Sequence, residues 1–270
     1  MLAGWGSNLE RKGHLGRPAT FFGRSLHLAS RLLTIRRMNL GLYRGVAALT
    51  VAEKSMDSIS SNLAGMRTPG FKRRSSANHA FHVGRFGSNE MAVKAAEHND
   101  FSQGDLSSDG NQLDLALKGD GFFEVEGPSG PLYTRDGEFR MERDGRLVTP
   151  EGHPVAWDRK ASQLDPSGEV IGVDHFGVVS QGGRTVGTLK VVAFADQEAL
   201  RHSQDGYFVA DPRAERTAST AQVRQFSLEQ SNVNPVEELV ALITVQRTHE
   251  RAAAIVSQID QSYRRLTSSR

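Results

Sequence analysis

The stretch from Asn232 to Leu266 constrains the fold of this chain more than any other. Within it, Asn234 and Pro235 predict the start of a helix, with a cap residue followed by proline at the first helical position. Hydrophobic residues then recur at alternating spacings of three and four, which is typical of a helix that packs along a partner helix. This C-terminal seam consists of Leu242, Val245, His249, Ala252, Val256, Ile259, Tyr263 and Leu266. At 1.5 Å per residue the predicted helix is about 48 Å long, more than a compact domain needs.

A matching pattern lies near the other end of the chain. This N-terminal seam consists of Leu42, Gly45, Leu49, Ala52, Met56, Ile59 and Leu63. We expect a helix over residues 39–66 that ends at Gly65, because the helix cannot cross the turn Thr68-Pro69-Gly70. Two surface helices on a globular core would show similar stripes. Long seams at both ends of a helix-poor middle favour a two-helix coiled coil that carries the middle as an insertion.

Composition excludes several classes of protein. The sequence has no cysteine, which excludes disulfides and thiolate metal sites. It contains no hydrophobic run long enough for a transmembrane helix, so we expect no direct membrane insertion. The pI near 9.0 comes from residues 1–37, which hold seven basic residues and one acidic residue. The rest of the chain is mildly acidic, so a nucleic-acid partner has no electrostatic support.

The first 37 residues allow three interpretations. Their Arg-rich, Gly-rich composition resembles an organelle transit peptide. A secretory signal peptide is the second interpretation, but these residues lack the hydrophobic region that such a signal needs. The interpretation that we favour places the true start at Met38 and treats the residues before it as a mis-assigned extension. The predicted organisation is a disordered or mis-assigned extension (1–37), an N-terminal helix and turn (38–74), a β-rich middle domain with extended connections (75–230) and a C-terminal helix (231–270).

The middle of the chain has the short period and the turn residues of β structure. Leu113 to Leu117 alternates, Gly119-Asp120-Gly121 is a turn, and Phe122 starts the next strand. The Asp-Gly pairs at Asp136 and Asp144 predict two hairpin turns of a meander. Later strands are expected at 168–174, 176–180, 186–194 and 206–209, and residues 75–104 are expected to be an extended connection. The fold class is therefore α+β with a mainly β centre.

No constellation of residues amounts to an active site. Asp136, Asp144 and Asp174 could form an acid–base set, but turn geometry already explains an aspartate before a glycine. His79 and His82 have the spacing of metal ligands, but no further ligand lies nearby, which indicates a solvated loop. Phosphate loops and hydrolase elbows are absent. We therefore expect no catalytic residue, no metal and no cofactor.

Three blocks together resemble the flagellar basal-body rod and hook family of bacteria. They are Ser61-Asn62-Leu63-Ala64-Gly65 with Thr68-Pro69-Gly70-Phe71-Lys72; Leu113-Asp114-Leu115-Ala116 with Gly119-Asp120-Gly121-Phe122-Phe123, Thr134-Arg135-Asp136-Gly137 and Gly145-Arg146-Leu147-Val148-Thr149; and Ser231-Asn232-Val233-Asn234 with Glu237-Glu238, Gln246-Arg247 and Glu250. In this order the match covers Met38 to Leu266. Met38 falls where such proteins normally begin. Counted from Met38, the chain is short for the family, which favours a proximal-rod type.

The resemblance implies a mechanical function. Similar proteins pair their terminal helices into the inner wall of a helical tube, the rod in the periplasmic space, which transmits torque for motility. They leave the cell through the flagellar type III export apparatus without a cleaved signal peptide. The implied partners are copies of the chain and other rod and hook subunits. The expected assembly interface is Leu42, Leu49, Met56, Ile59, Asn62, Leu63, Phe71, Leu242, Val245, His249, Val256, Ile259, Tyr263 and Leu266.

Two departures from the family pattern and one alternative function bear on this assignment. The family usually has Asn where Gly65 stands, which predicts a looser loop after the first helix, and an aromatic or similar residue where His249 stands. A histidine inside the seam could add pH sensitivity, although a packed and satisfied His edge explains it as well. The alternative function is a non-flagellar surface or binding module with a β-meander domain and a helical stalk.

Overall fold

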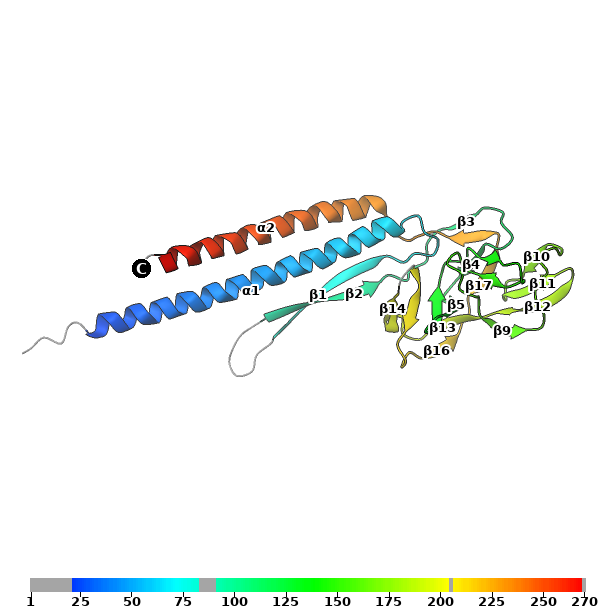
Figure 1. The fold of residues 1–270 in the computed structure, drawn as a ribbon, viewed down its shortest axis with the longest axis horizontal. Coiled ribbons are helices and arrows are strands. Elements are labelled where there is room, and N and C mark those ends of the chain that lie inside the picture. The colour runs from blue at the N-terminus through cyan, green and yellow to red at the C-terminus, as the bar shows by residue number, and fades with distance from the viewer. Residues whose placement is uncertain (1–20, 83–90, 204–205, 269–270) are drawn as a thin grey trace, which may run out of the picture. The chain divides into compact units, whose positions relative to one another are not determined.

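The computed structural model describes residues 21–82, 91–203 and 206–268, with the side chains of all of these except 21–40, 77–82, 91–96 and 266. The chain divides into two units. One consists of Met1–Val46 with Ile255–Arg270, and the other is Ala47–Ala254. The architecture is α+β, with a mainly β middle between an N-terminal and a C-terminal helix (Figure 1).

The N-terminal helix, α1, spans Phe21–Gly65. Its end at Gly65 confirms the predicted stop, and Thr68 N donates to Gly65 O at 3.0 Å in the turn that follows. Residues 21–37, for which we expected no regular structure, are helical. The reason is local, because no proline stands between Pro18 and Pro69 to interrupt a run rich in Leu, Ala and Arg, which are strong helix formers.

The C-terminal helix, α2, spans Pro235–Ser268. Its predicted cap is confirmed, because Val236 N donates to Asn234 Oδ1 at 3.1 Å and Asn234 Nδ2 donates to Glu237 Oε1 at 3.1 Å. The two helices pack together. In the first unit, a Cβ atom on Gly45 would lie 2.6 Å from Val256 Cγ2. Glycine is therefore needed at position 45 for this close approach of the two helices.

A β-hairpin follows α1 where we expected an extended connection. Strand β1 (Arg74–His82) pairs antiparallel with β2 (Met91–Asn99), and Arg74 lies opposite Asn99. Neither strand shows the regular hydrophobic alternation that identifies a half-buried strand, so no sequence pattern predicts them. His79 and His82 lie in β1, and their side chains are outside the described residues.

The strands from β3 to β18, residues 106–229, form what we call the β domain. A six-stranded sheet has the order β14-β15-β6-β5-β13-β16, and a four-stranded sheet has the order β10-β11-β12-β9. Three strand pairs, β17-β4, β18-β3 and β7-β8, complete it. The bounds are β3 Leu106–Ser108, β4 Leu115–Lys118, β5 Phe122–Gly127, β6 Gly130–Thr134, β7 Arg140–Met141, β8 Leu147–Val148, β9 Trp157–Lys160, β10 Ile171–Val173, β11 Val178–Gln181, β12 Arg184–Leu189, β13 Val191–Phe194, the 3-10 turn η1 Gln197–Ala199, β14 Leu200–His202, β15 Phe208–Ala210, β16 Arg216–Ala218, β17 Gln222–Gln225 and β18 Ser227–Glu229.

Two expectations for the β domain are corrected. The single strand expected at 186–194 is divided at Lys190, so that β12 joins the four-stranded sheet and β13 the six-stranded one. Gly145, at φ 75°, turns β7 into β8 as predicted. Gly137 makes no hairpin. Leu115 N donates to Gly137 O at 3.0 Å, and a Cβ atom on Gly137 would overlap the carbonyl oxygen of Leu115.

Two hydrophobic clusters fill the β domain. The larger joins side chains of the four-stranded sheet with β4, β5 and β17 and includes Leu115, Phe123, Phe139, Ile171 and Val179. The smaller lies on the six-stranded sheet and consists of Phe122, Tyr133, Val192, Phe194, Leu200 and Phe208. Within the described residues neither helix contains a segment that could cross a membrane. Among the described side chains, no three His, Asp or Glu residues are placed to hold a metal ion.

Candidate functional site

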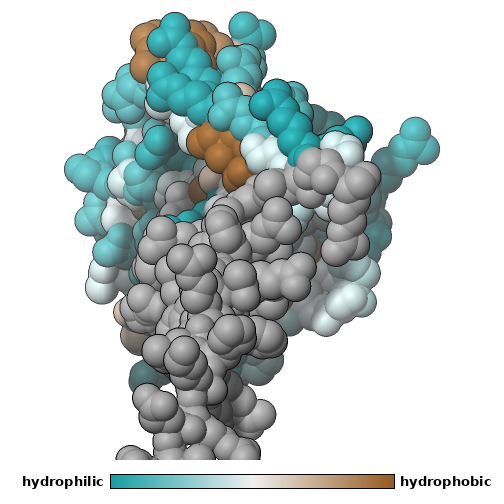
Figure 2. Space-filling view, turned by 90° about the vertical axis from the view of Figure 1, so that its left-hand side faces the viewer, coloured by the Kyte–Doolittle hydropathy of each residue, from teal (hydrophilic) through white to brown (hydrophobic). Residues whose placement is uncertain are grey.

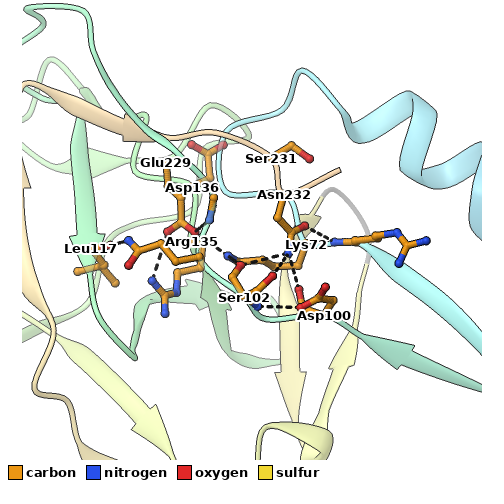
Figure 3. A network of polar contacts seen from close by, with 12 residues as sticks. Lys72, Asp100, Ser102, Leu117, Arg135, Asp136, Glu229, Ser231 and Asn232 are labelled. Carbon is orange, nitrogen blue, oxygen red and sulfur yellow. Dashed lines mark hydrogen bonds and ion pairs between the residues drawn. The ribbon is translucent and has the colours of Figure 1, made fainter. Parts of the chain in front are cut away.

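Residues within or beside the three sequence blocks meet at one buried cluster of charges (Figure 3). Lys72 Nζ donates to Glu229 Oε1 at 2.6 Å, and Arg135 Nη1 donates to Glu229 Oε2 at 3.2 Å. The three side chains, which we call the ion cluster, are at most 2% exposed. Lys72 follows α1, Arg135 follows β6 and Glu229 ends β18, so one carboxylate joins three distant segments of the chain.

The ion cluster holds more positive than negative charge. Burial lowers the pKa of Lys72, and the carboxylate of Glu229 partly offsets this effect. Burial lowers the pKa of Arg135 in the same way. Two further bonds reach neutral acceptors, because Lys72 Nζ also donates to Ser102 O at 2.7 Å and Arg135 Nη2 to Gly119 O at 2.8 Å. The buried Nε of Arg135 has no hydrogen-bond partner among the described residues. The cluster therefore combines short hydrogen bonds with buried charges and one unpartnered donor, a combination that adds little net stability.

The residues beside Lys72 reach both helices. Arg73 Nε donates to Glu238 Oε1, in the first turn of α2, at 2.6 Å. The backbone N–H of Arg73 donates to Asn232 Oδ1 at 2.7 Å, just before α2. Arg74 is bound to α1, because Asn62 Nδ2 donates to Arg74 O and Arg74 N donates to Asn62 Oδ1, both at 2.8 Å. Asn62 thus acts as a short strand partner for the start of β1.

Glycines allow the loop between α1 and β1 to fit closely. Gly70 has φ +67°, and a Cβ atom there would overlap the backbone of Arg135 and Asp136. A Cβ atom on Gly65 would overlap the ring of Phe71, which is buried. The loop after α1 is therefore closely packed at Gly65, and the expectation that glycine loosens it is wrong. The reason is that the ring of Phe71 occupies the space beside Gly65.

The seam positions lie on the sheltered faces of the two helices. In the second unit Ala52 and Ala252 are 3% and 5% exposed, and Ile59 is 7% exposed. The other seam residues with described side chains are buried or half-buried, His249 among them. The side chain of Leu266 is outside the described residues. Burial within one chain agrees with the spacing, whereas the role of these residues as an interface between subunits stays a prediction.

Sequence reasoning missed a second hydrophobic face on α2. Its exposed fractions are 67% for Val236, 51% for Leu239, 60% for Val240 and 52% for Ile243. The spacing i, i+3, i+4, i+7 places these four residues on one face, and at 100° per residue that face lies opposite the seam. We call it the outer stripe. Hydrophobic atoms lie exposed among hydrophilic ones at the top of the view in Figure 2, where α2 forms the upper edge of Figure 1.

The acidic residues considered for catalysis have structural explanations. Asp144 Oδ1 accepts from Arg146 N at 3.2 Å, and Asp174 Oδ1 accepts from Phe176 N and Val178 N at 2.9 Å, so each closes its own turn. Asp136 Oδ1 accepts from Glu138 N at 2.9 Å. Burial raises the pKa of Asp136 to about 7, and the charges of Glu138 and Glu151 act in the same direction.

The raised pKa of Asp136 predicts an unusual pH dependence of stability. The unfolded chain releases this proton near pH 4 and the folded chain only near pH 7. The folded state therefore binds more protons, and the free energy of unfolding should fall as the pH rises from 4 to 7. We expect Asp136→Asn to be more stable than the parent chain by about 4 kcal/mol at pH 8 and equally stable at pH 4. Urea unfolding at both pH values measures this difference. Asp158→Asn, at an exposed position on β9, should show no such difference.

Comparison with known proteins decides the family. Residues 116–181 match the domain family described as flagellar hook protein FlgE/F/G D1 domain, and residues 224–269 match flagellar basal body rod FlgEFG protein C-terminal. The chain is 32% identical over 227 residues to the flagellar basal-body rod protein FlgF of Caulobacter vibrioides, which covers 81% of this chain and 93% of that one. The chain belongs to the flagellar basal-body rod protein family.

Other members of the rod family are also similar over most of their length. The FlgF protein of Mesorhizobium japonicum is 33% identical, with 83% of this chain and 95% of that protein covered. The FlgG protein of Buchnera aphidicola subsp. Schizaphis graminum is 28% identical, with 84% and 98% covered. The family is structural, so the chain is a rod protein of the bacterial flagellum and not an enzyme. The binding-module alternative is set aside.

Proposed function

We propose that this rod protein assembles with copies of itself and with other rod and hook subunits into a helical tube that transmits torque to the hook. The observation that carries the proposal is the two-faced α2, with a sheltered seam on one side and the exposed outer stripe on the other. The seam of α2 already packs along α1, so the outer stripe is not needed for the packing of the isolated chain. A neighbouring subunit would cover it.

The size of the outer stripe suits a repeated assembly. Fully burying one large aliphatic side chain contributes about 1.5–3 kcal/mol, and about half of each of the four is free to be covered. One such contact therefore contributes about 3–6 kcal/mol, which corresponds to weak pairwise association. Monomers would stay apart in dilute solution, whereas a subunit held by several neighbours would be stable. A heterologous contact that does not close generates a helical filament.

Several finer features complete the proposal. The seams of α1 and α2 would pair as a coiled coil, with Asn62 and Phe71 holding its base. The subunit would take a proximal-rod position. The rod would lie in the periplasmic space, after export through the flagellar type III apparatus without a cleaved signal peptide. The resemblance of the three sequence blocks to the rod and hook family supports these features.

A charge in the seam tests the proposal. Val256 is a half-buried seam residue next to Gly45, and Ser257 beside it is exposed. We expect Val256→Asp to remove the chain from purified basal bodies, as measured by mass spectrometry, and to abolish swimming, because an unpaired carboxylate cannot be buried between helices. Ser257→Asp should assemble and swim normally. The thermal unfolding of the β domain should be unchanged in both variants.

Either of two results would contradict the proposal. Normal swimming by the Val256→Asp strain would show that the seam has no role in assembly. If the unaltered chain were absent from basal bodies and abundant in another cell fraction, this member of the family would not be a subunit of the rod.

A further inference from the structure

The ion cluster lies where the two helices join the β domain, inside the unit formed by Ala47–Ala254. We infer that it is a latch, which holds the ends of α1 and α2 in one orientation to the β domain and carries load between them. The second part of this inference rests on the proposed rod function, and the first part does not. We call residues 62–75 and 229–240 the junction.

Three consecutive residues connect the three parts of the junction. Lys72 binds Glu229 and, through it, Arg135 of the β domain. Arg73 binds Glu238 in the first turn of α2. The backbone of Arg74 binds Asn62 in the last turns of α1. A rotation of either helix against the β domain would break contacts on neighbouring residues of the same short segment.

Glu229 is the centre of this arrangement. Its Oε1 accepts from Lys72 Nζ and from Gly104 N, the latter at 3.0 Å, and its Oε2 accepts from Arg135. Its backbone oxygen accepts from Gly70 N at 2.7 Å. The partners Lys72 and Arg135 stand 157 and 94 residues away in the sequence. Glu229 thus holds both the segment by which the chain enters the β domain after α1 and the segment by which it leaves the β domain before α2.

The use of buried charged side chains indicates that the ion cluster serves to fix the orientation of the helices to the β domain. A hydrophobic trio of similar volume often stabilises a fold at least as well as buried ions do. Buried ions are selective in direction, because each bond must keep its length and angle once water is excluded. The buried Nε of Arg135 adds to this argument, since a buried donor without a partner among the described residues costs stability. What the cluster supplies is a single permitted geometry.

The test removes one arm of the latch and leaves a neutral pair behind. In the full-length protein, Lys72→Met keeps Arg135 and Glu229 bonded to each other, so we expect the β domain to remain folded. The matched control is Lys190→Met, which removes a lysine that binds Glu124 at 2.9 Å within the β domain. Hydrogen exchange should become at least tenfold faster throughout the junction in Lys72→Met and should be unchanged at β5 and β15.

A narrower variant removes a different arm. Arg73→Gln changes a side chain that is 36% exposed, so its effect on folding should be small. We expect faster exchange over residues 233–240 alone, because only the contact to α2 is lost. The latch is overturned if the Lys72→Met and Lys190→Met proteins exchange alike at the junction. It is also overturned if exchange at β5 and β15 rises as much as at the junction, since the cluster would then be ordinary core.

The transfer of load through the latch needs a measurement in cells. Strains with Lys72→Met should build basal bodies in normal numbers but lose speed more steeply than the Lys190→Met strain as the medium becomes more viscous. Equal dependence on viscosity would overturn load transfer and leave the hydrogen-exchange result standing. Absence of the unaltered chain from basal bodies would instead contradict the proposed function, which the exchange experiment does not involve.

Discussion

Placing one methyl group on Gly137 should prevent the β domain from folding. The Cβ atom would overlap the carbonyl oxygen of Leu115, and backbone on both sides leaves no flexible side chain to move away. Leu115 is 1% exposed and belongs to the larger hydrophobic cluster, so the strand cannot shift without opening that core. We expect Gly137→Ala to lower the free energy of unfolding by more than about 3 kcal/mol. Circular dichroism would record loss of the unfolding transition or a fall in Tm beyond about 6 °C.

The control for this variant is another glycine without neighbours. Gly152 has φ +90°, and its two chain neighbours aside, no described residue has an atom within 4 Å of the place that an added methyl group would take. Gly152→Ala should therefore cost only about 1 kcal/mol, from the unfavourable backbone angle. If Gly137→Ala melted within a few degrees of Gly152→Ala, the close approach of Gly137 to Leu115 would not exist in solution.

The same glycine shows why sequence reasoning reached the β-rich class but not the path of the chain. Asp-Gly at Asp136 and at Asp144 looks identical in sequence, and only the second makes a hairpin turn. At Gly137 the glycine is required by contact with a segment far away in sequence. The same is true at Lys190, where the continuous β-forming run 186–194 is divided between two sheets. Local propensity does not record which sheet a strand joins.

The helices were predictable because their signals are local. Asn234 and Pro235 mark the start of α2, Gly65 marks the end of α1, and a spacing of three and four marks the seams. The ion cluster was not predictable, since Lys72, Arg135 and Glu229 resemble ordinary surface charges until the fold buries them. The resemblance to the rod family placed all three within or beside its blocks, but it gave no reason for their chemistry.

The outer stripe could have been found from sequence. Val236, Leu239, Val240 and Ile243 repeat at helical spacing, in a phase opposite to that of the seam. The seam is the stronger pattern because it continues from Leu242 to Leu266, whereas the stripe occupies only the first turns of α2 and ends after Ile243. A helix with two hydrophobic faces, one long and one short, is the sign of a helix with two kinds of neighbour.

A carboxylate in the outer stripe should abolish assembly and leave the monomer intact. Val240 and Ile243 are 60% and 52% exposed, so Val240→Asp or Ile243→Asp should change the free energy of unfolding by no more than about 0.5 kcal/mol. Covered by a neighbour, the same carboxylate would have to lose its water without a partner. We expect the purified monomers to unfold like the parent, and the strains to lack rods and not to swim.

This prediction separates the two faces of α2. Val256→Asp acts on the helix pair inside each subunit, whereas Val240→Asp acts only between subunits, so loss of swimming with a normal monomer belongs to the outer stripe alone. Gln246→Asp is the control, because position 246 is exposed, already polar and on the same helix. If Val240→Asp and Ile243→Asp both swam like the Gln246→Asp strain, subunit contacts would have to lie elsewhere. The exposed face of α2 would then need another partner.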